Sequence, residues 1–283
     1  MYLAEVCLTA APHSLIVPLM RANRPSSAPA AKARIRLVTR GDDAGSCRSA
    51  NLAILETFQR GIVRNVSMMA AAPEVEHAAE TFRNVPGLCL GFHAALNCEW
   101  DWPRWGPVLP RERVPSLLDA DGCLAKTPQD FSDRHASLDE MAAELAAQLS
   151  RLRALGLKIA YLDQHMGLGW LPGLGAKLSA LARSAGLLEA DQLVKSLPGA
   201  GRHGTHAEDL IARLKAAPPG TYVAVGHPCY DDAETRAFAG IGMPEGQIGV
   251  DRDGQRRMFL DSAVLECCRE LGVEPIRYTE VQR

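Results

Sequence analysis

The chain has 283 residues, a length that suits one large α/β domain or two small ones. Its apolar content of 47% and charged content of 23% are typical of a globular protein. The net charge of −2 argues against a nucleic-acid-binding surface, and the absence of any apolar run of about 20 residues argues against a membrane span.

The first 33 residues differ in composition from the rest of the chain. Residues 25–31 form a low-complexity segment of Pro, Ser and Ala, which offers little to bury. The apolar patch at residues 15–20 is too short for a membrane helix, and it lacks the positively charged stretch that precedes the core of a secretory signal. We therefore expect residues 1–33 to be a disordered N-terminal extension, with a loosely docked arm as the alternative.

From residue 35 onward, short β-branched or apolar runs alternate with amphipathic stretches. The runs predict strands at 35–39, 65–69, 89–91, 159–162, 221–225 and 275–278. The amphipathic stretches predict helices at about 49–60, 73–83, 137–155, 176–184, 205–216 and 258–271. Two of these helices open with capping-box patterns, Ser137 with Glu140 and Thr205 with Glu208. This alternation predicts an α/β fold with a single (β/α) barrel-like domain, of an irregular TIM type, over residues 34–283.

A stretch at about 97–135 interrupts the alternation. It is rich in Pro, Gly and Trp and too long for an ordinary connection, which predicts a functional insertion or a lid. It contains Trp100, Trp102 and Trp105 close to acidic and basic side chains such as Asp101. Aromatic faces with neighbouring polar groups suit a carbohydrate cleft, and a hydrophobic cluster that pins the loop is the alternative.

Polar segments follow four of the predicted strands. These segments are Asp42-Asp43, His93, Asp163-Gln164-His165 and His227. Because the C-terminal ends of parallel strands meet on one face of a sheet or barrel, we expect these side chains to converge. The paired carboxylates of Asp42-Asp43 and three imidazoles at one rim indicate a divalent metal ion with a general base and a general acid beside it.

Each segment also has a simpler interpretation. Asp42-Asp43 can form an Asx-type turn before a helix, His93 can be a hydrogen-bonded core histidine, and Gly226-His227-Pro228 can be a turn. Asp163 and His165 are two positions apart on extended backbone, so both can face one cation, or Asp163 can lie behind the ligands. The recurrence of all four segments at the same structural position favours the site.

These motifs resemble those of the YdjC-like carbohydrate deacetylases, which include the chitooligosaccharide and hopanoid-associated deacetylases. The resemblance runs from about residue 35 to the C-terminus. It rests on Asp42-Asp43-Ala44-Gly45, Gly91-Phe92-His93, Glu99-Trp100-Asp101, Leu162-Asp163-Gln164-His165 and His227-Pro228, in this order. It implies a TIM-like (β/α) barrel that removes acetyl groups from N-acetylated sugars with a divalent metal ion.

Carried over to this chain, the resemblance implies Asp43, His93 and His165 as metal ligands, Asp42 as the base and His227 as the acid. Which carboxylate of the Asp42-Asp43 pair binds the metal is left open. The substrate-binding candidates are Trp100, Asp101, Trp105 and Asp163. The chain departs from the family pattern at Ala44, where many members have Phe, and at Gly167, where many have a further His.

We therefore expect metal-dependent hydrolysis of an N-acetyl group on an amino sugar, with Zn or Mg as the ion, or else Co or Mn. A non-catalytic carbohydrate-binding protein on a degenerate barrel and hydrolysis of another amide or ester are the alternatives. The expected partner is an N-acetylated sugar, and a homodimer is left open. The eight scattered cysteines, without a CxxC spacing, favour buried thiols in a reducing cytoplasm.

Overall fold

The computed structural model describes residues 35–199, 204–240 and 242–281, and Ala33–Arg283 form one compact unit. The N-terminal extension that we expected at residues 1–33 lies outside the described residues. Among the helices in the described part of the chain, none is long and apolar enough to cross a membrane.

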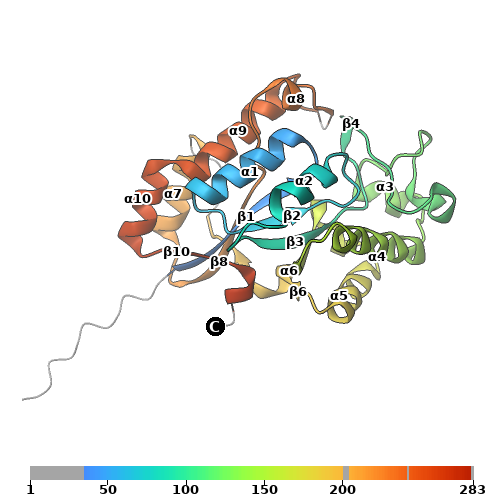
Figure 1. The fold of residues 1–283 in the computed structure, drawn as a ribbon, viewed down its shortest axis with the longest axis horizontal. Coiled ribbons are helices and arrows are strands. Elements are labelled where there is room, and N and C mark those ends of the chain that lie inside the picture. Colours follow the sequence, from blue (N-terminus) through green and yellow to red (C-terminus); the bar gives the residue numbers. More distant parts are fainter. Residues whose placement is uncertain (1–34, 200–203, 241, 282–283) are drawn as a thin grey trace, which may run out of the picture. The chain divides into compact units, whose positions relative to one another are not determined.

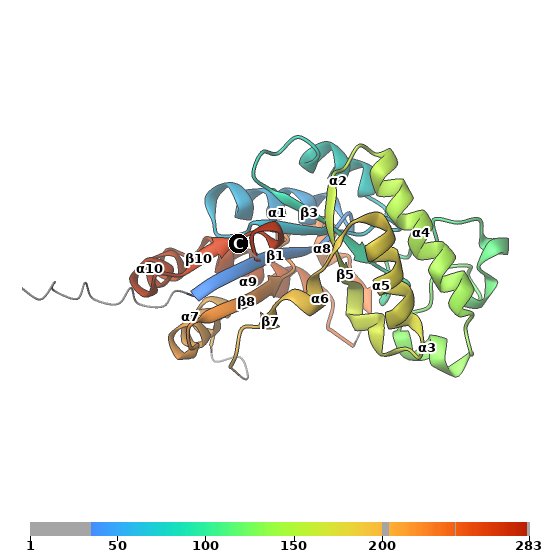
Figure 2. The same cartoon turned by 90° about the horizontal axis from the view of Figure 1, so that it is seen from below.

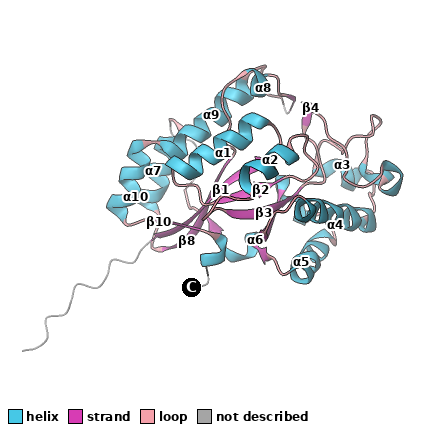
Figure 3. Cartoon of the chain, in the orientation of Figure 1, coloured by secondary structure: helices cyan, strands magenta, loops and turns pink. Residues whose placement is uncertain are grey.

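Within the described residues, eight parallel strands form the central sheet, and helices cover it on the outside (Figure 1; Figure 3). The strand order is β6-β5-β3-β2-β1-β8-β7, and β10 pairs with the first half of β1. The strands are β1 (Ile35–Ala44), β2 (Asn65–Met68), β3 (Cys89–Ala94), β5 (Ile159–Gln164), β6 (Leu188–Glu189), β7 (Lys195–Ser196), β8 (Gly220–Gly226) and β10 (Glu274–Ile276). Every strand predicted from the sequence is present, whereas the two-residue strands β6 and β7 are too short to leave a sequence pattern.

The sheet curls until its two edges approach each other. β6 and β7 stand at opposite ends of the strand order, yet only the short helix α6 (Ala190–Leu193) and one further residue connect them. A connection of this length spans at most about 20 Å. Figure 2 shows α6 between β5 and β7. The sheet is therefore barrel-like, as expected, and the C-terminal ends of its strands face a common opening.

Side chains alternate between the two faces of β1, as extended backbone requires. Leu37 is buried in the outer cluster that contains Leu210 and Val264 from the surrounding helices. Its neighbour Val38 is buried on the other face, in the cluster that contains Tyr161 and Tyr278. β1 is therefore covered on both faces, which explains its nearly continuous apolar run before the polar end.

The helices pack around the sheet. They are α1 (Arg48–Arg60), α2 (Val75–Phe82), α3 (Pro128–Asp133), α4 (Leu138–Ala154), α5 (Leu174–Ala185), α7 (His206–Ala216), α8 (Ala233–Arg236), α9 (Gln247–Leu260) and α10 (Ser262–Leu271). The capping box of α7 is present. The Thr205 side chain accepts from the backbone N–H of Glu208, and the Glu208 carboxylate accepts from the backbone N–H of Thr205. In α4 the Ser137 side chain accepts from the backbone of Glu140, but the Glu140 carboxylate bonds Ser116 instead of closing the box.

The single helix predicted at 258–271 is wrong, because two helices occupy this part of the chain. Asp261 has extended backbone (φ −62°, ψ 128°), which ends α9, and its side chain accepts from Ala263 N at the start of α10. α9 was not predicted over most of its length, because its sequence is rich in charged residues and contains two interior glycines. This omission matters, because α9 contributes to the candidate site.

The insertion at about 97–135 is folded onto α4. It contains the short strand β4 (Trp100–Trp102), which pairs with β9 (Ala239–Gly240), and the helix α3. The buried carboxylate of Glu144 on α4 accepts from Val108 N at 2.8 Å and from Leu109 N at 3.0 Å. These bonds satisfy two partly buried backbone donors and attach this part of the insertion to α4.

Candidate active site

The strands that carry the polar segments continue further than the sequence predicts. Asp42 and Asp43 therefore lie within the end of β1, and His93 lies within β3. In the register of the sheet, His93 of β3 is directly opposite Asp163 of β5. The strand ends border a cleft of about 380 Å³, within the size range of small-molecule sites. The cleft is lined by Asp42, Asp43, His93, Glu99, Trp100, Gln164, His165, Met166, Gly167, His227 and Arg252.

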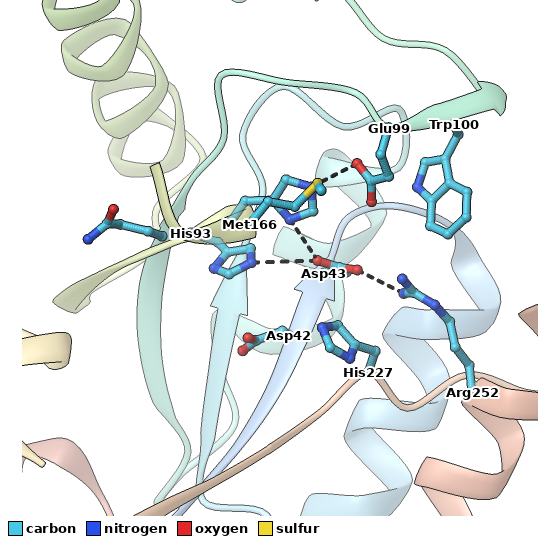
Figure 4. Close-up of a pocket in the computed structure, with 11 residues that line it drawn as sticks. Asp42, Asp43, His93, Glu99, Trp100, Met166, His227 and Arg252 are labelled. Carbon is cyan, nitrogen blue, oxygen red and sulfur yellow. Dashed lines mark hydrogen bonds and ion pairs between the residues drawn. The ribbon is translucent and has the colours of Figure 1, made fainter. Parts of the chain in front are cut away.

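Three buried side chains direct potential ligand atoms at one point of this cleft. Asp43 Oδ1 lies 3.5 Å from His93 Nε2 and 3.3 Å from His165 Nδ1, and the ligand atoms of the three residues are all within 4.8 Å of one another. Figure 4 shows Asp43 with His93 on one side and Arg252 on the other. The buried Asp43 Oδ1 has no hydrogen-bond partner. One carboxylate oxygen and two imidazole nitrogens fit a divalent cation, which would satisfy that orphaned oxygen.

Two further carboxylates hold the histidines in orientation. Glu99 Oε2 lies 2.8 Å from His165 Nε2, and Asp163 Oδ2 lies 3.2 Å from His93 Nδ1. Each carboxylate favours a proton on the nitrogen that it faces, which leaves the other nitrogen free to bind a cation. In the sequence, Glu99 was only one of the acidic residues beside the tryptophans and part of the motif Glu99-Trp100-Asp101, and its pairing with His165 was not predicted.

Arg40 connects the carboxylates behind the cleft. Its guanidinium binds Asp42 through Nε at 2.6 Å and Nη2 at 2.8 Å, and its Nη1 lies 2.8 Å from Asp163 Oδ2. Burial alone lowers the pKa of Arg40, but Asp163 and Asp42 outweigh burial and hold it well above its ordinary value. Asp42, His93 and Asp163 also form a compact group of potential ligands, but the carboxylates of Asp42 and Asp163 already pair with the single positive charge of Arg40. A cation therefore fits the group of Asp43, His93 and His165.

His227 and Arg252 border the other side of the cleft. Arg252 Nη1 donates to Asp43 Oδ2 at 2.8 Å, and its guanidinium lies over the Trp100 ring at 5.3 Å from the centroid. Burial raises the pKa of Asp43, but Arg252 and the two histidines outweigh burial and hold it well below its usual range. Burial lowers the pKa of His227. The cleft thus combines a candidate cation site with a carboxylate, Asp42, and a predominantly neutral imidazole.

The family model for YdjC-like protein matches residues 36–270, which is most of the chain. The chain belongs to the YdjC-like family. It is 32% identical to a carbohydrate deacetylase of Brevibacillus brevis over 131 residues, which are 46% of this chain and 49% of that protein. It is 31% identical to a chitooligosaccharide deacetylase of Yersinia pestis over 153 residues, which are 53% of this chain and 57% of that protein. The matches span about half the length of these curated relatives.

A solved structure confirms the fold class. The chain superimposes with a TM-score of 0.73 on a protein of Enterococcus faecalis V583 that has been provisionally described as a cellobiose-phosphate cleavage protein. The match covers 88% of this chain and 99% of that chain, at 21% sequence identity. At this identity the likeness shows the fold alone.

Among the expected substrate-binding residues of this YdjC-like chain, one lines the cleft and three do not. Trp100 lines it. Asp163 is fully buried beside His93, is bonded to Arg40 and Ser67, and does not line the cleft. Trp105 is only 4% exposed and donates to Asn97 O, while Asp101 pairs with Lys126 away from the cleft. The burial of Trp105 agrees with the alternative of a hydrophobic cluster that pins the insertion.

The two departures from the family pattern occupy different environments. Ala44 is fully buried, so the methyl group there is part of the core. Gly167 lines the cleft with φ +64°, and a Cβ added there would meet no atom within 4 Å. The cleft is therefore open at Gly167, where many family members carry an imidazole.

Metal binding is expected to strengthen as the pH rises toward about 9. Burial alone lowers the pKa of His165, but Glu99 and Asp43 outweigh burial and raise it to about 9. Asp163 and Asp42 likewise outweigh burial and hold the pKa of His93 well above its ordinary value. A cation needs unprotonated His165 Nδ1 and His93 Nε2, so binding releases protons, and affinity should fall by about tenfold or more per pH unit below these pKa values. Calorimetric titration of Zn²⁺ in buffers of different ionisation enthalpy measures this release. An affinity that is constant between about pH 6.5 and 8.5 would contradict the expectation.

Proposed function

We propose that this chain is a metal-dependent carbohydrate deacetylase, which hydrolyses the N-acetyl group of an amino sugar. The observation that carries the proposal is the convergence of Asp43, His93 and His165 in the cleft that Asp42 and His227 also line. Membership of the YdjC-like family and the names of the curated relatives support the substrate class. Asp43, His93 and His165 would hold the ion, and their mixed nitrogen and oxygen donors suit Zn, with Mg, Co or Mn as the other candidates.

When bound at this site, a divalent cation supplies Lewis acidity, which polarises a carbonyl and lowers the pKa of water. Asp42 is the candidate base. Its two oxygens accept from Arg40, and each retains a lone pair for a second partner. Arg40 therefore fixes the direction of the carboxylate without blocking it. Asp42 takes a proton from the attacking water as the new C–O bond forms.

His227 is the candidate acid. The amide C–N bond breaks readily only if the leaving nitrogen receives a proton, because an amine is a poor leaving group as an anion. Burial lowers the pKa of His227, so its protonated form is a stronger acid than an exposed imidazolium. The same shift makes that form scarcer at neutral pH. The products are acetate and the free amino sugar.

The proposal predicts acetate release from N-acetylglucosamine oligomers that stops on treatment with EDTA and returns when Zn²⁺ or another divalent cation is added. Asp42→Asn should lower kcat by about 10²- to 10⁴-fold, the usual contribution of an acid or base. An enzyme-coupled acetate assay measures both effects. Binding of the oligomers without acetate release would favour a carbohydrate-binding protein. Activity on another amide or ester in a substrate panel, without activity on these oligomers, would change the substrate class.

A further inference from the structure

The side chain of Gln255 on α9 has a defined orientation against His227. Its Oε1 lies 2.7 Å from the backbone N of His227 and 3.1 Å from His227 Nδ1. A backbone N–H can only donate, so the oxygen of the amide must face His227. On the other side, Gln255 Nε2 donates to Asp251 Oδ2 at 2.7 Å. A carboxylate can only accept, so both neighbours independently require the same orientation of the amide.

This orientation determines where His227 carries its proton when it is neutral. Because Gln255 Oε1 is an acceptor, His227 Nδ1 must be the protonated nitrogen. His227 Nε2 then remains as the nitrogen that can exchange a proton with a substrate. If the amide were reversed, its NH₂ group would face the backbone N–H of His227 and would favour a proton on Nε2.

A second helix holds Asp251 in place. Asp251 Oδ1 lies 3.2 Å from Nε2 of His206, the first residue of α7. His206 approaches α9 so closely that a Cβ added to Gly254 would lie 2.8 Å from its Cδ2 atom. A glycine inside a helix costs about 0.5–1 kcal/mol relative to alanine, so this contact gives a physical reason for Gly254. The chain of contacts from His206 through Asp251 and Gln255 to His227 thus joins α7 and α9 to the end of β8.

We infer that Gln255 and Asp251 are positioning residues that fix the tautomer of His227, so that His227 Nε2 is the nitrogen that exchanges protons in the cleft. The inference rests on the proposed role of His227 in deacetylation. Gln255 is a neutral acceptor, whereas Asp42, Asp43 and Arg252 are the charged groups that face His227. The negative charge of Asp251 lies behind Gln255, where it orients the Gln255 amide without pairing directly with the His227 imidazole.

Three variants test this inference. Gln255→Leu removes the acceptor, and Asp251→Asn removes the requirement for one amide orientation. The double variant combines Asp251→Asn with Gln255→Glu, so that the new amide at position 251 can donate to the new carboxylate at position 255, which can accept from His227. The contact between positions 251 and 255 and the contact with His227 then each keep a donor and an acceptor, but the negative charge moves next to His227. Gln247→Glu is the matched control, because it makes the same chemical change at the exposed first residue of α9.

Long-range ¹H–¹⁵N correlation spectra of the imidazoles report the tautomer directly, and His227→Gln identifies the signals of His227. We expect the Nδ1–H tautomer in the wild type and a measurable Nε2–H population in Gln255→Leu and Asp251→Asn. These two variants should lose about 10- to 100-fold in kcat, with KM within about twofold, as for other residues that orient a functional imidazole. The double variant should recover the Nδ1–H tautomer and most of kcat.

The double variant should also raise the pKa of His227 by about one unit or more, and its pH–rate profile should shift in the same direction. A residue that only supports packing would not produce this shift. Wild-type tautomer and wild-type kcat in both single variants would overturn the inference. If His227→Gln released acetate normally, the role of His227 in the proposed function would fail instead. The tautomer spectra would still show whether Gln255 and Asp251 fix the Nδ1–H tautomer of His227.

Discussion

Replacing His93 or His165 with alanine is expected to abolish binding of a divalent cation and to lower acetate release by about 10³-fold or more, since a catalytic metal contributes several kcal/mol. Each variant removes one of two imidazoles and leaves the buried Asp43 carboxylate with fewer partners. Metal content after dialysis against Zn²⁺ and the rate of acetate release are the measurements.

His135→Ala is the matched control, because His135 is exposed within the insertion and lies outside the lining of the cleft. Circular dichroism in the near ultraviolet shows whether each variant keeps its packing. Stoichiometric metal together with full activity in His93→Ala or His165→Ala would remove that residue from the proposed ligand set.

Arg40→Met is expected to lower the free energy of unfolding by about 3–5 kcal/mol at neutral pH, because it leaves the buried carboxylates Asp42 and Asp163 without their shared cation. Burial raises the pKa of Asp163, and Arg40 and His93 together reverse this, so that its pKa lies below the ordinary value. Wild-type Asp163 therefore contributes stability at neutral pH that is lost as the pH falls through its lowered pKa.

Without Arg40, burial should raise the folded-state pKa of Asp163 above its unfolded value. The folded variant then binds protons more readily than the unfolded chain. The difference in free energy of unfolding between the wild type and Arg40→Met should therefore shrink as the pH falls from about 7 to about 5. Urea unfolding across this pH range measures the effect. Arg183→Met, on the exposed last turn of α5, should change stability by less than about 0.5 kcal/mol. A loss in Arg40→Met as small as in this control would contradict the role assigned to Arg40.

The sequence predicts the strands and the convergence of their polar ends well, because both follow from local rules. Parallel strands end on the same side of a sheet, so Asp43, His93 and His165 could be placed together from their positions alone. The ion pair between Arg40 and Asp42 could also have been predicted from a local rule. Arg40 and Asp42 are two positions apart on extended backbone and therefore share a face, which is where their ion pair forms.

The remaining contacts of the site depend on tertiary placement. Glu99 lies 66 positions before His165, and Gln255 lies 28 positions after His227. No local pattern joins either pair. The helix that carries Arg252 and Gln255 has a charged sequence without a clear apolar stripe, so α9 was not predicted at all over these positions. Trp105 shows a related difficulty, because stacking on a sugar and packing in a core require the same kind of side chain.

The position of β1 has a consequence for how the protein is made. β1 is the first strand of the sheet, yet it pairs with β8 and β10, and Arg40 contacts Tyr278 across 238 positions. A ribosome must therefore synthesise nearly the whole chain before the middle of the sheet can close. Such high contact order slows folding and leaves the earlier strands with unpaired edges on the nascent chain. The polypeptide should accordingly depend on protection from aggregation until its last strand has emerged.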